Sequence, residues 1–323
     1  MSDNVSRRSF LRYPFALGTS LGMAGLLQQL ARAIDYTKPV PEAKGLTAYF
    51  NGSNVLIRNN NMPLTAYRAH DSLKYPYFSP VNGPVTGISL TSESALPYPH
   101  HRGLWLGCQP INGGDYWGDN SLNSGQIRAD DLSLSDTTVK SVIINNRCTW
   151  IRKNAPSPFK DDRIFTISVL DEKVWTIDAD LKITALENVS IKKAKHSFFA
   201  IRAASDISPP YGGILANSQG GVGAKGTYGK EAEWCGYHGR RAGRPDIVEG
   251  IAVMTHPKNP FRSIWFTRDY GHLSPSPFNF LDKPWTIEKG RSIRLRYRIA
   301  LHAGTPSQAG LDKVYRQWLK ESP

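Results

Sequence analysis

The chain has 323 residues, with 40 lysines and arginines against 27 aspartates and glutamates, and a formal net charge of +13. The positive charges are spread along the whole sequence without a basic helix, which does not support a nucleic-acid partner. The three cysteines lack CxxC spacing, which excludes a zinc ribbon and a dense disulfide framework but leaves open one disulfide among Cys108, Cys148 and Cys235.

The first 33 residues have the layout of a twin-arginine signal peptide. Arg7 and Arg8 are followed by Phe10 and a weakly apolar stretch over residues 13–30, and Ala31-Arg32-Ala33 suits a signal peptidase. The stretch is too interrupted to be a membrane span. We therefore expect export by the Tat translocase, a mature chain that begins near Ile34 with no membrane span, and a periplasmic or extracellular location.

The dominant pattern between residues 46 and 304 has a period of two. In 175–183 and again in 293–301 the odd positions are mostly apolar and the even positions mostly polar, as in strands with one solvated face. Segments 139–152, 163–170 and 190–203 are also predicted to be strands. We expect residues 34–323 to form a single all-β domain, an antiparallel β-sandwich.

One convincing helix is predicted, over residues 307–321 near the end of the chain. Its apolar residues recur at helical spacing, at Leu311, Val314, Tyr315, Trp318 and Leu319. The pattern indicates a terminal helix packed on the sheet. Because β and α segments do not alternate and no glycine fingerprint follows a strand, the sequence supports neither a Rossmann fold nor a TIM barrel.

Three regions interrupt the strand pattern with His, Trp, Gly and Pro, and loops on a rigid sheet are where functional sites usually lie. They are 97–107 with 114–118, 213–218 with 228–237, and 249–260 with 265–279. Since a sandwich brings loops from separate strands together, we expect the three regions to line one pocket.

Five residues of these regions are candidate catalytic groups. His100, His101 and His256 offer imidazoles that titrate near neutral pH, and Asp115 and Glu233 are the nearest carboxylates. Neighbouring histidines on a regular strand would point to opposite faces, and a bulged turn would relax this. The alternative for each histidine is a structural one, with its ring bonded to backbone in a turn, or at a loop end for His256.

The remaining candidates are residues suited to binding a substrate. Arg102 and Arg268 have forked guanidinium groups for oxygen ligands, although a salt bridge inside the protein is the alternative. Trp117 stands between glycines and is the better aromatic platform, whereas Trp105 lies in an apolar strand and is expected in the core. The third region adds Asp269, Tyr270 and Asn279. The row Arg294, Arg296 and Arg298 is expected on a solvated face.

These blocks resemble the PmoA-like family of bacterial exported proteins of unassigned function. The resemblance runs from about residue 77 to 304 and is specific in the combination of blocks 100–103, 256–260 and 268–271. It implies a β-sandwich similar to the galactose mutarotase supersandwich, in bacteria that export sugar-degrading systems. In relatives further histidines stand at the places of Ser79 and Tyr98, so the resemblance leaves a divalent metal cofactor open without a clear ligand motif here.

The leading hypothesis is an exported carbohydrate-active enzyme of lyase, hydrolase or epimerase type. It would use acid/base catalysis on a sugar, a keto-sugar or a glycoside, with a small molecule or an oligosaccharide as substrate. The first alternative is a carbohydrate-binding protein without catalysis, for which aromatic and arginine contacts suffice. The second alternative is a metal-dependent oxidoreductase.

The export signal makes a direct prediction about location. Replacing Arg7 and Arg8 together by lysine removes the adjacent arginines that the translocase recognises, so the double variant should accumulate inside the cell. Cell fractionation with an antibody against the folded domain measures this. A normal periplasmic yield of the double variant would contradict the twin-arginine interpretation.

Overall fold

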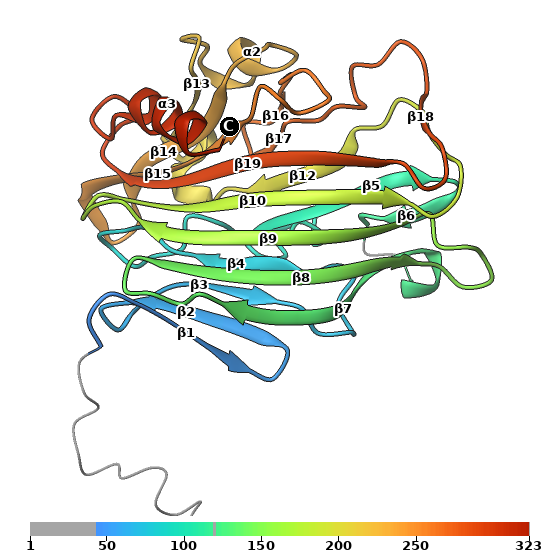
Figure 1. Cartoon of the computed structure of the whole chain (residues 1–323). Helices are drawn as coiled ribbons and strands as arrows, with labels where there is room; N and C mark the ends of the chain where they lie inside the picture. The colour runs from blue at the N-terminus through green and yellow to red at the C-terminus, as the bar shows by residue number, and fades with distance from the viewer. Residues whose placement is uncertain (1–42, 119–120, 323) are drawn as a thin grey trace, which may run out of the picture. The chain divides into compact units, whose positions relative to one another are not determined.

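Two large antiparallel sheets lie face to face in the computed structural model, which describes residues 43–118 and 121–322 (Figure 1). The expected signal peptide, residues 1–33, lies outside the described residues, so export and the start of the mature chain stay predictions. Within the described part of the chain, no helix is long and apolar enough to cross a membrane.

The first sheet, as far as the chain is described, has nine strands in the order β1-β2-β3-β4-β5-β12-β17-β16, with β6 paired to β5. Its strands are β1 (Leu46–Asn51), β2 (Asn54–Asn59), β3 (Met62–Arg68), β4 (Tyr77–Val81), β5 (Leu104–Ile111), β6 (Gly114–Tyr116), β12 (His196–Arg202), β16 (Phe266–Thr267) and β17 (His272–Ser274).

The second sheet has eight strands in the described residues, in the order β13-β14-β15-β19-β10-β9-β8-β7. Its strands are β7 (Gln126–Ser135), β8 (Ser141–Ile151), β9 (Phe159–Val169), β10 (Val174–Ala185), β13 (Ile214–Asn217), β14 (Trp234–Arg241), β15 (Arg244–Thr255) and β19 (Ser292–Ala303). The smaller elements are β11 (Val189–Ile191) paired with β18 (Trp285–Ile287), the 3-10 turns η1 (Leu122–Ser124), η2 (Ser205–Ile207) and η3 (Pro209–Tyr211), and the helices α2 (Gly223–Thr227) and α3 (Leu311–Glu321).

The predicted fold class is confirmed, and most of the predicted strands are found, although the segment 190–203 is divided between β11 and β12. The alternating segment 175–183 lies within β10, and 293–301 lies within β19, which pairs with β10 along its whole length. Residues at alternate positions of β8 and β9 are buried, as the period of two requires. The described chain is mostly antiparallel β, and α3 is its one helix longer than a five-residue turn.

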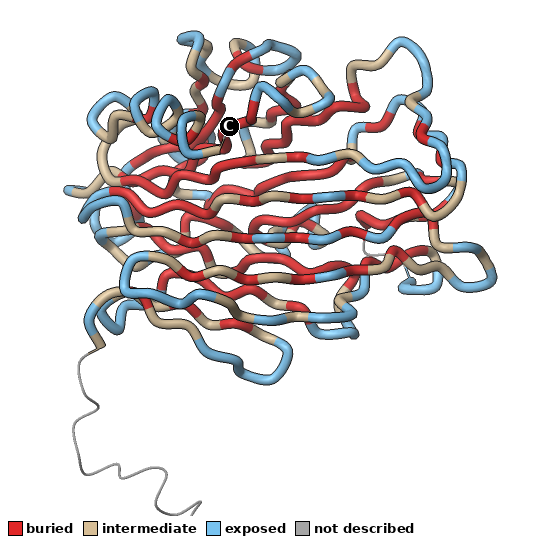
Figure 2. Tube along the Cα trace, viewed as in Figure 1, coloured by how far each residue is buried: buried red, intermediate tan, exposed pale blue. Residues whose placement is uncertain are grey.

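The core lies between the two sheets, and Figure 2 shows buried residues along the strands of both. Phe78 of the first sheet meets Phe165 of the second edge to face at 4.9 Å, and Phe199 stacks on Tyr297 at 4.7 Å between ring centroids. Such aromatic pairs add about 1 kcal/mol each to the free energy of burial. The core therefore joins the sheets into one sandwich.

Helix α3 packs on the second sheet through a buried arginine. It begins at Leu311 instead of residue 307, because Gly310 has a left-handed φ of 64° that is incompatible with helix. Arg298 is only 3% exposed, donates to Asp178 at 2.6 and 2.7 Å, and lies 5.7 Å from the Trp318 ring. The expected solvated arginine row is therefore wrong at Arg298, which anchors the helix.

All three cysteines of the sequence are free and buried, at positions 108, 148 and 235. Burial raises the pKa of each thiol. No disulfide joins them, and they lie in the core as small apolar groups with little thiolate character.

Candidate functional site

Eight aromatic and imidazole rings meet along strands β5, β12 and β17 of the first sheet, where we place the candidate site. This ring cluster consists of Tyr98, His100, His101, Trp105, Trp117, His196, Tyr270 and His272. Strand β12 pairs with β5 on one side and with β17 on the other. This pairing brings together rings from the loop before β5, from β5 itself, from the residue after β6, from the start of β12, and from the start of β17 with the turn before it.

The inner part of the ring cluster is a stack around His101. Its imidazole lies 4.6 Å from His272, 5.2 Å from Tyr98 and 5.4 Å from Trp105, with planes within 27° of parallel. His101 is 3% exposed and His272 is 1% exposed. The Nη1 of Arg202 lies 3.4 Å from His101 Nδ1. These two histidines therefore belong to the interior of the protein.

The outer part of the cluster holds the two half-buried histidines. The His196 ring stacks on Trp117 at 5.1 Å, and the His100 ring lies 6.3 Å from His196 and 4.6 Å from His101. The neighbours His100 and His101 precede β5 in a turn, which lets their rings touch at 85° while only His101 is buried. The turn supplies the relaxation that a regular strand would not.

Burial keeps the imidazoles of His101, His196 and His272 neutral. Desolvation, with repulsion from His100 next, lowers the pKa of His101 to about 2 and that of His196 to about 4. Burial and the neighbouring His101 hold the pKa of His272 well below its ordinary value. A neutral imidazole has one donor and one acceptor nitrogen, so these rings can give and accept hydrogen bonds at physiological pH.

Several buried polar atoms of the cluster have no hydrogen-bond partner among the described residues. They are Nδ1 and Nε2 of His272 and the indole Nε1 of Trp105 and Trp117. Buried polar groups are paired in most proteins, and exceptions call for an explanation. The cluster thus has hydrogen-bonding capacity that the protein does not use itself.

A short polar chain orients His196. Asp115 accepts hydrogen bonds from the backbone N–H of Trp117 and Gly118 at 2.9 and 2.8 Å. With the Gln109 amide turned so that its nitrogen faces Asp115 at 2.6 Å, its oxygen accepts from His196 Nδ1 at 2.8 Å. The proton of the neutral ring is then held on Nδ1. His196 Nε2 is therefore left with its lone pair, as a general base requires.

The other predicted binding residues have contacts around the cluster rather than in it. The guanidinium of Arg268 lies 4.3 Å from the Phe266 ring and 4.9 Å from Tyr228. Asn279 donates to the Tyr228 hydroxyl at 3.1 Å. Arg268 and Asn279 thus share a neighbour.

Asp269 and Arg102 have different neighbours. Asp269 accepts from the backbone N–H of Ala224 at 2.7 Å and so holds α2. The Arg102 guanidinium lies 6.0 Å from the Tyr77 ring. Trp117 is fully buried, so the expectation that it offers an open platform is wrong.

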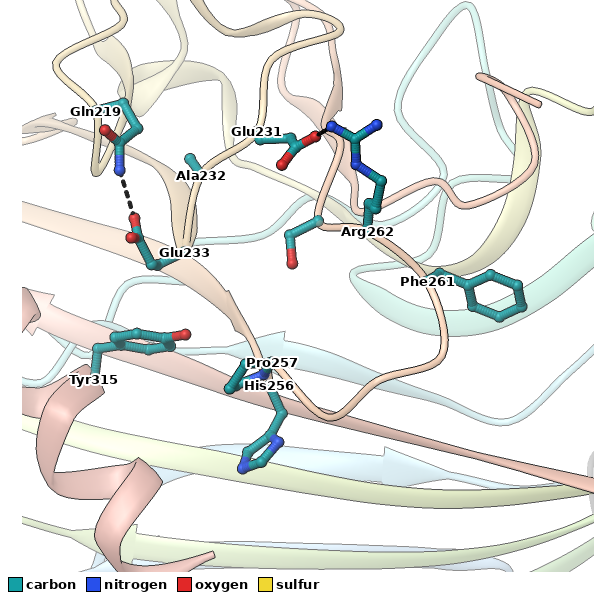
Figure 3. A pocket seen from close by; sticks show the side chains of 10 residues that line it. Gln219, Glu231, Ala232, Glu233, His256, Pro257, Phe261, Arg262 and Tyr315 are labelled. Atoms are coloured by element: carbon teal, nitrogen blue, oxygen red, sulfur yellow. Dashed lines mark hydrogen bonds and ion pairs between the residues drawn. The ribbon is translucent and has the colours of Figure 1, made fainter. Parts of the chain in front are cut away.

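The expected single pocket is not found, because the catalytic candidates divide between two places. His256 and Glu233 line a pocket of about 500 Å³ whose walls include neither His100, His101 nor Asp115 (Figure 3). His256 follows β15 of the second sheet, whereas His100 and His101 precede β5 of the first.

His256 serves the backbone in this pocket. Its Nδ1 accepts from the Lys258 N–H at 3.1 Å, and its Nε2 lies 2.8 Å from the Ser322 carbonyl. Both ring nitrogens are therefore used, with Nε2 as the donor. Its role is the structural alternative, a loop-end anchor.

Three members or neighbours of the cluster were missed by the sequence reasoning, namely His196, Arg202 and His272. Arg202 is 5% exposed, and its guanidinium lies 4.6 Å from the Tyr270 ring. His196 and Arg202 lie within the predicted strand 190–203, and His272 lies within the region 265–279. In the structure His196 begins β12, an otherwise mostly apolar strand, and this histidine is the signal that was present. For the described residues, no group of three His, Cys, Asp or Glu is placed to hold a metal ion.

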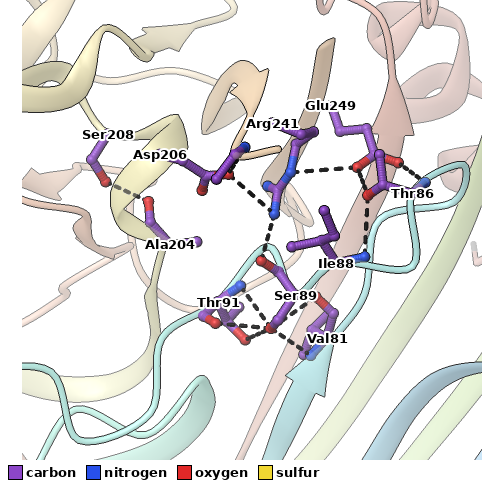
Figure 4. A network of polar contacts seen from close by, with 11 residues as sticks. Val81, Thr86, Ile88, Ser89, Thr91, Ala204, Asp206, Ser208, Arg241 and Glu249 are labelled. Carbon is purple, nitrogen blue, oxygen red and sulfur yellow. Dashed lines mark hydrogen bonds and ion pairs between the residues drawn. The ribbon is translucent and has the colours of Figure 1, made fainter. Parts of the chain in front are cut away.

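A buried network fixes the long connection between β4 and β5 that carries His100 and His101 (Figure 4). Glu249 of β15 is fully buried and accepts from the N–H of Val85 and Thr86 at 2.8 and 3.0 Å. Arg241 lies 3.5 Å from Glu249 and donates to the Ser89 carbonyl at 2.8 Å. The first part of the connection is therefore tied to the second sheet before it reaches the cluster.

The sequence matches the family described as a family of unknown function (DUF6807) over residues 54–316. The chain belongs to this family. The expected PmoA-like assignment is wrong, since DUF6807 is the family that matches and nothing points to a PmoA-like one. Among curated proteins no sequence matches this DUF6807 protein.

Two solved structures are similar to this DUF6807 protein at low TM-scores. A galactose mutarotase related enzyme from Lactobacillus acidophilus is 7% identical, with a TM-score of 0.27. The alignment covers 80% of this chain and 97% of that enzyme's chain. A GalM/aldose epimerase homologue from C. elegans is 9% identical, with a TM-score of 0.31. The alignment covers 81% of this chain and 99% of the homologue's chain. Likeness at this level carries no argument about activity.

The buried neutral histidines predict how stability depends on pH. A histidine whose pKa is lowered on folding contributes fully to stability above its unfolded pKa of about 6.5. The contribution is lost as the pH falls from there toward the folded value, about 2 for His101. Each such ring should lower the free energy of unfolding by about 1.4 kcal/mol for every pH unit of acidification in that window.

Replacing His272 by Phe should therefore reduce the slope of unfolding free energy against pH by the contribution of about one histidine. Denaturant unfolding between neutral and mildly acidic pH measures the slope. His70→Asn, at an exposed position outside the cluster, is the control for the replacement of a histidine. An unchanged slope in the His272 variant would show that this ring is charged or solvated.

The Glu249 network predicts a second effect on stability. Glu249→Gln puts an amide donor among the N–H groups that face the carboxylate and removes the charge opposite Arg241, so unfolding free energy should fall by about 3 kcal/mol. Asp246→Asn on the exposed part of the same strand should have no measurable effect. Equal thermal stability of the two variants would contradict a role of the network in fixing the connection.

Proposed function

We propose that this DUF6807 protein is an exported carbohydrate-active enzyme that moves a proton on a sugar, a keto-sugar or a glycoside at the mouth of the ring cluster. The observation that carries the proposal is the Asp115–Gln109–His196 chain. In this chain the base His196 is held by the Gln109 amide, and Gln109 is in turn held by the Asp115 carboxylate. Orientation of this kind is what acid/base catalysis demands of a histidine.

His196 is the base in this proposal. With Nδ1–H directed at Gln109, its Nε2 takes a proton from a substrate hydroxyl or from a C–H next to a carbonyl, and the ring becomes positive. The nearby carboxylate of Asp115 favours that positive form and acts through Gln109. The centroid of the His100 ring lies 6.3 Å from that of His196, close enough for both to act on the same ligand. In this proposal His100 gives a proton to the ligand, or accepts one from it, on the side opposite His196.

The substrate platform is assigned to Tyr98. This residue is 37% exposed, and its ring lies 5.1 Å from the ring of Tyr270, which is half-buried. A sugar presents C–H groups on its faces and hydroxyls at its edges, which suits an open aromatic ring beside neutral imidazoles that donate and accept hydrogen bonds. No charged substrate group is needed for these contacts, so a neutral sugar fits the site.

One observation favours a non-catalytic carbohydrate-binding protein as the second candidate. The pKa of His196, about 4, makes the ring a weaker base than an ordinary histidine. The same neutral ring remains a full hydrogen-bond partner for a sugar hydroxyl. In this second function Tyr98 and the imidazoles bind the sugar, and Asp115 serves only to orient His196.

Turnover of oxidised and unoxidised glycosides by the protein without residues 1–33, read out by product mass, separates the two functions. His196→Ala should lower turnover by about a hundredfold or more with little change in melting temperature, because the ring is half-buried. His70→Ala is the matched control at an exposed site. A protein that binds a glycoside through Tyr98 but never converts one would support the binding function.

The proposal would be contradicted if His196→Ala and Tyr98→Ala both kept full turnover and full binding of every active glycoside. In that outcome the ring cluster is a structural core element. The melting temperatures of the two variants are measured alongside, so that a loss of folding is not taken for a loss of function.

A further inference from the structure

The pocket that contains Glu233 has its own chemistry, separate from the ring cluster. Its volume of about 500 Å³ is within the range of small-molecule sites. Its walls come from four parts of the chain, as Figure 3 shows, and its polar and aromatic residues are Gln219, Glu231, Glu233, His256, Phe261, Arg262, Ser263 and Tyr315. We call it the Glu233 pocket.

Arg262 is the one arginine or lysine among the described residues that line the pocket, and it is already paired. Arg262 forms an ion pair with Glu231 across the upper wall in Figure 3. His256 adds no positive charge, because burial and the nearby Arg296 lower its pKa and both of its ring nitrogens contact backbone groups. These residues therefore leave the charge of Glu233 unbalanced.

Glu233 is held as a carboxylate by neutral donors. Its Oε2 accepts from the Ser218 hydroxyl and, at 2.8 Å, from the Gln219 side-chain amide. These hydrogen bonds lower the pKa of Glu233, with Ser218 as the largest cause. Among the described residues, no lysine, arginine or histidine forms an ion pair with it. A negative charge with open space in front of it attracts a cation.

An aromatic ring stands beside this carboxylate. Tyr315 of α3 lies on the same side of the pocket as Glu233 in Figure 3, and its hydroxyl donates to the Thr255 carbonyl at 3.3 Å. Burial and then the charge of Glu233 raise the pKa of Tyr315, which agrees with their closeness. A carboxylate next to an aromatic ring is the combination that binds ammonium groups, by charge and by cation–π attraction.

We propose that the Glu233 pocket binds a small organic cation with a primary ammonium group, of the amino-sugar class. The ammonium would lie between the Glu233 carboxylate and the Tyr315 ring, with its third N–H toward Gln219 or water. The volume accommodates a ring of monosaccharide size. The Glu231–Arg262 pair on the opposite wall can take up hydroxyl contacts.

Glucosamine and glucose form the matched pair of probes, because they differ by one amino group in place of a hydroxyl. Titration is followed by the side-chain amide NMR signals of Gln219 at about pH 6, where such an amine is protonated. We expect saturable shifts with glucosamine and none with glucose at equal concentrations. Raised sodium chloride should weaken the glucosamine response, since screening acts on a partly exposed charge.

Glu233→Gln keeps the shape of the side chain and removes its charge, so glucosamine binding should weaken about tenfold or more. Glu172→Gln, in the exposed turn between β9 and β10, is the control and should bind as the unchanged protein does. His196→Ala should also retain glucosamine binding, because the ring cluster is a different site. If the Glu233 pocket does not bind glucosamine, the function proposed for the ring cluster is unaffected.

Two outcomes would overturn the inference. One is an equal response to glucose and glucosamine in the unchanged protein, which would mean that no ammonium is recognised. The other is a folded Glu233→Gln variant with undiminished glucosamine binding. If that variant does not fold, the comparison of the two sugars and its dependence on salt decide the matter in the unchanged protein.

Discussion

The ring of His272 lies among His101, Trp105, Trp117 and Phe266 and is almost completely shielded from water. A buried imidazole without a carboxylate partner must stay neutral, because a charge there would lose its hydration without compensation. The neutral state of this ring lets His101 stack on it, and the stack in turn supports Tyr98 and Tyr270 at the surface. The candidate site depends on this burial.

The sandwich separates two kinds of chemistry. Strands β5, β12 and β17 of the first sheet carry the ring cluster with the neutral imidazoles of His101, His196 and His272, while the pocket beside α3 and the second sheet carries the Glu233 carboxylate. Buried polar links hold the parts in place: Glu249 ties the β4–β5 connection to β15, and Arg298 ties α3 to β10. Each link is a paired charge, which a protein interior tolerates.

The strands could be predicted because burial on one face imposes a period of two, and the alternation over 175–183 sets both β10 and its register with β19. The end of the chain was predicted as helix because Leu311 and Trp318 face the sheet. The start was four residues too early, since the sequence does not reveal the left-handed φ of Gly310.

The site was only partly predictable, for reasons of topology. His196 and His272 join His101 because β12 lies between β5 and β17, and pairing between strands so distant in the chain has no local signature. For the same reason the residues expected in one pocket divide between the two sheets. Trp117 looked exposed among its glycines, but it is fully buried, and Gly107 allows the chain to pack closely against its ring.

The most direct measurement is the protonation state of the ring cluster by NMR of ¹⁵N-labelled histidine, with and without a glycoside. At about pH 6, where an ordinary histidine is largely protonated, the account predicts neutral rings for His101, His196 and His272. It also predicts a proton on Nδ1 of His196 and a change in its Nε2 signal when a glycoside binds. Imidazolium signals for these rings, or a His196 proton on Nε2, would contradict the account.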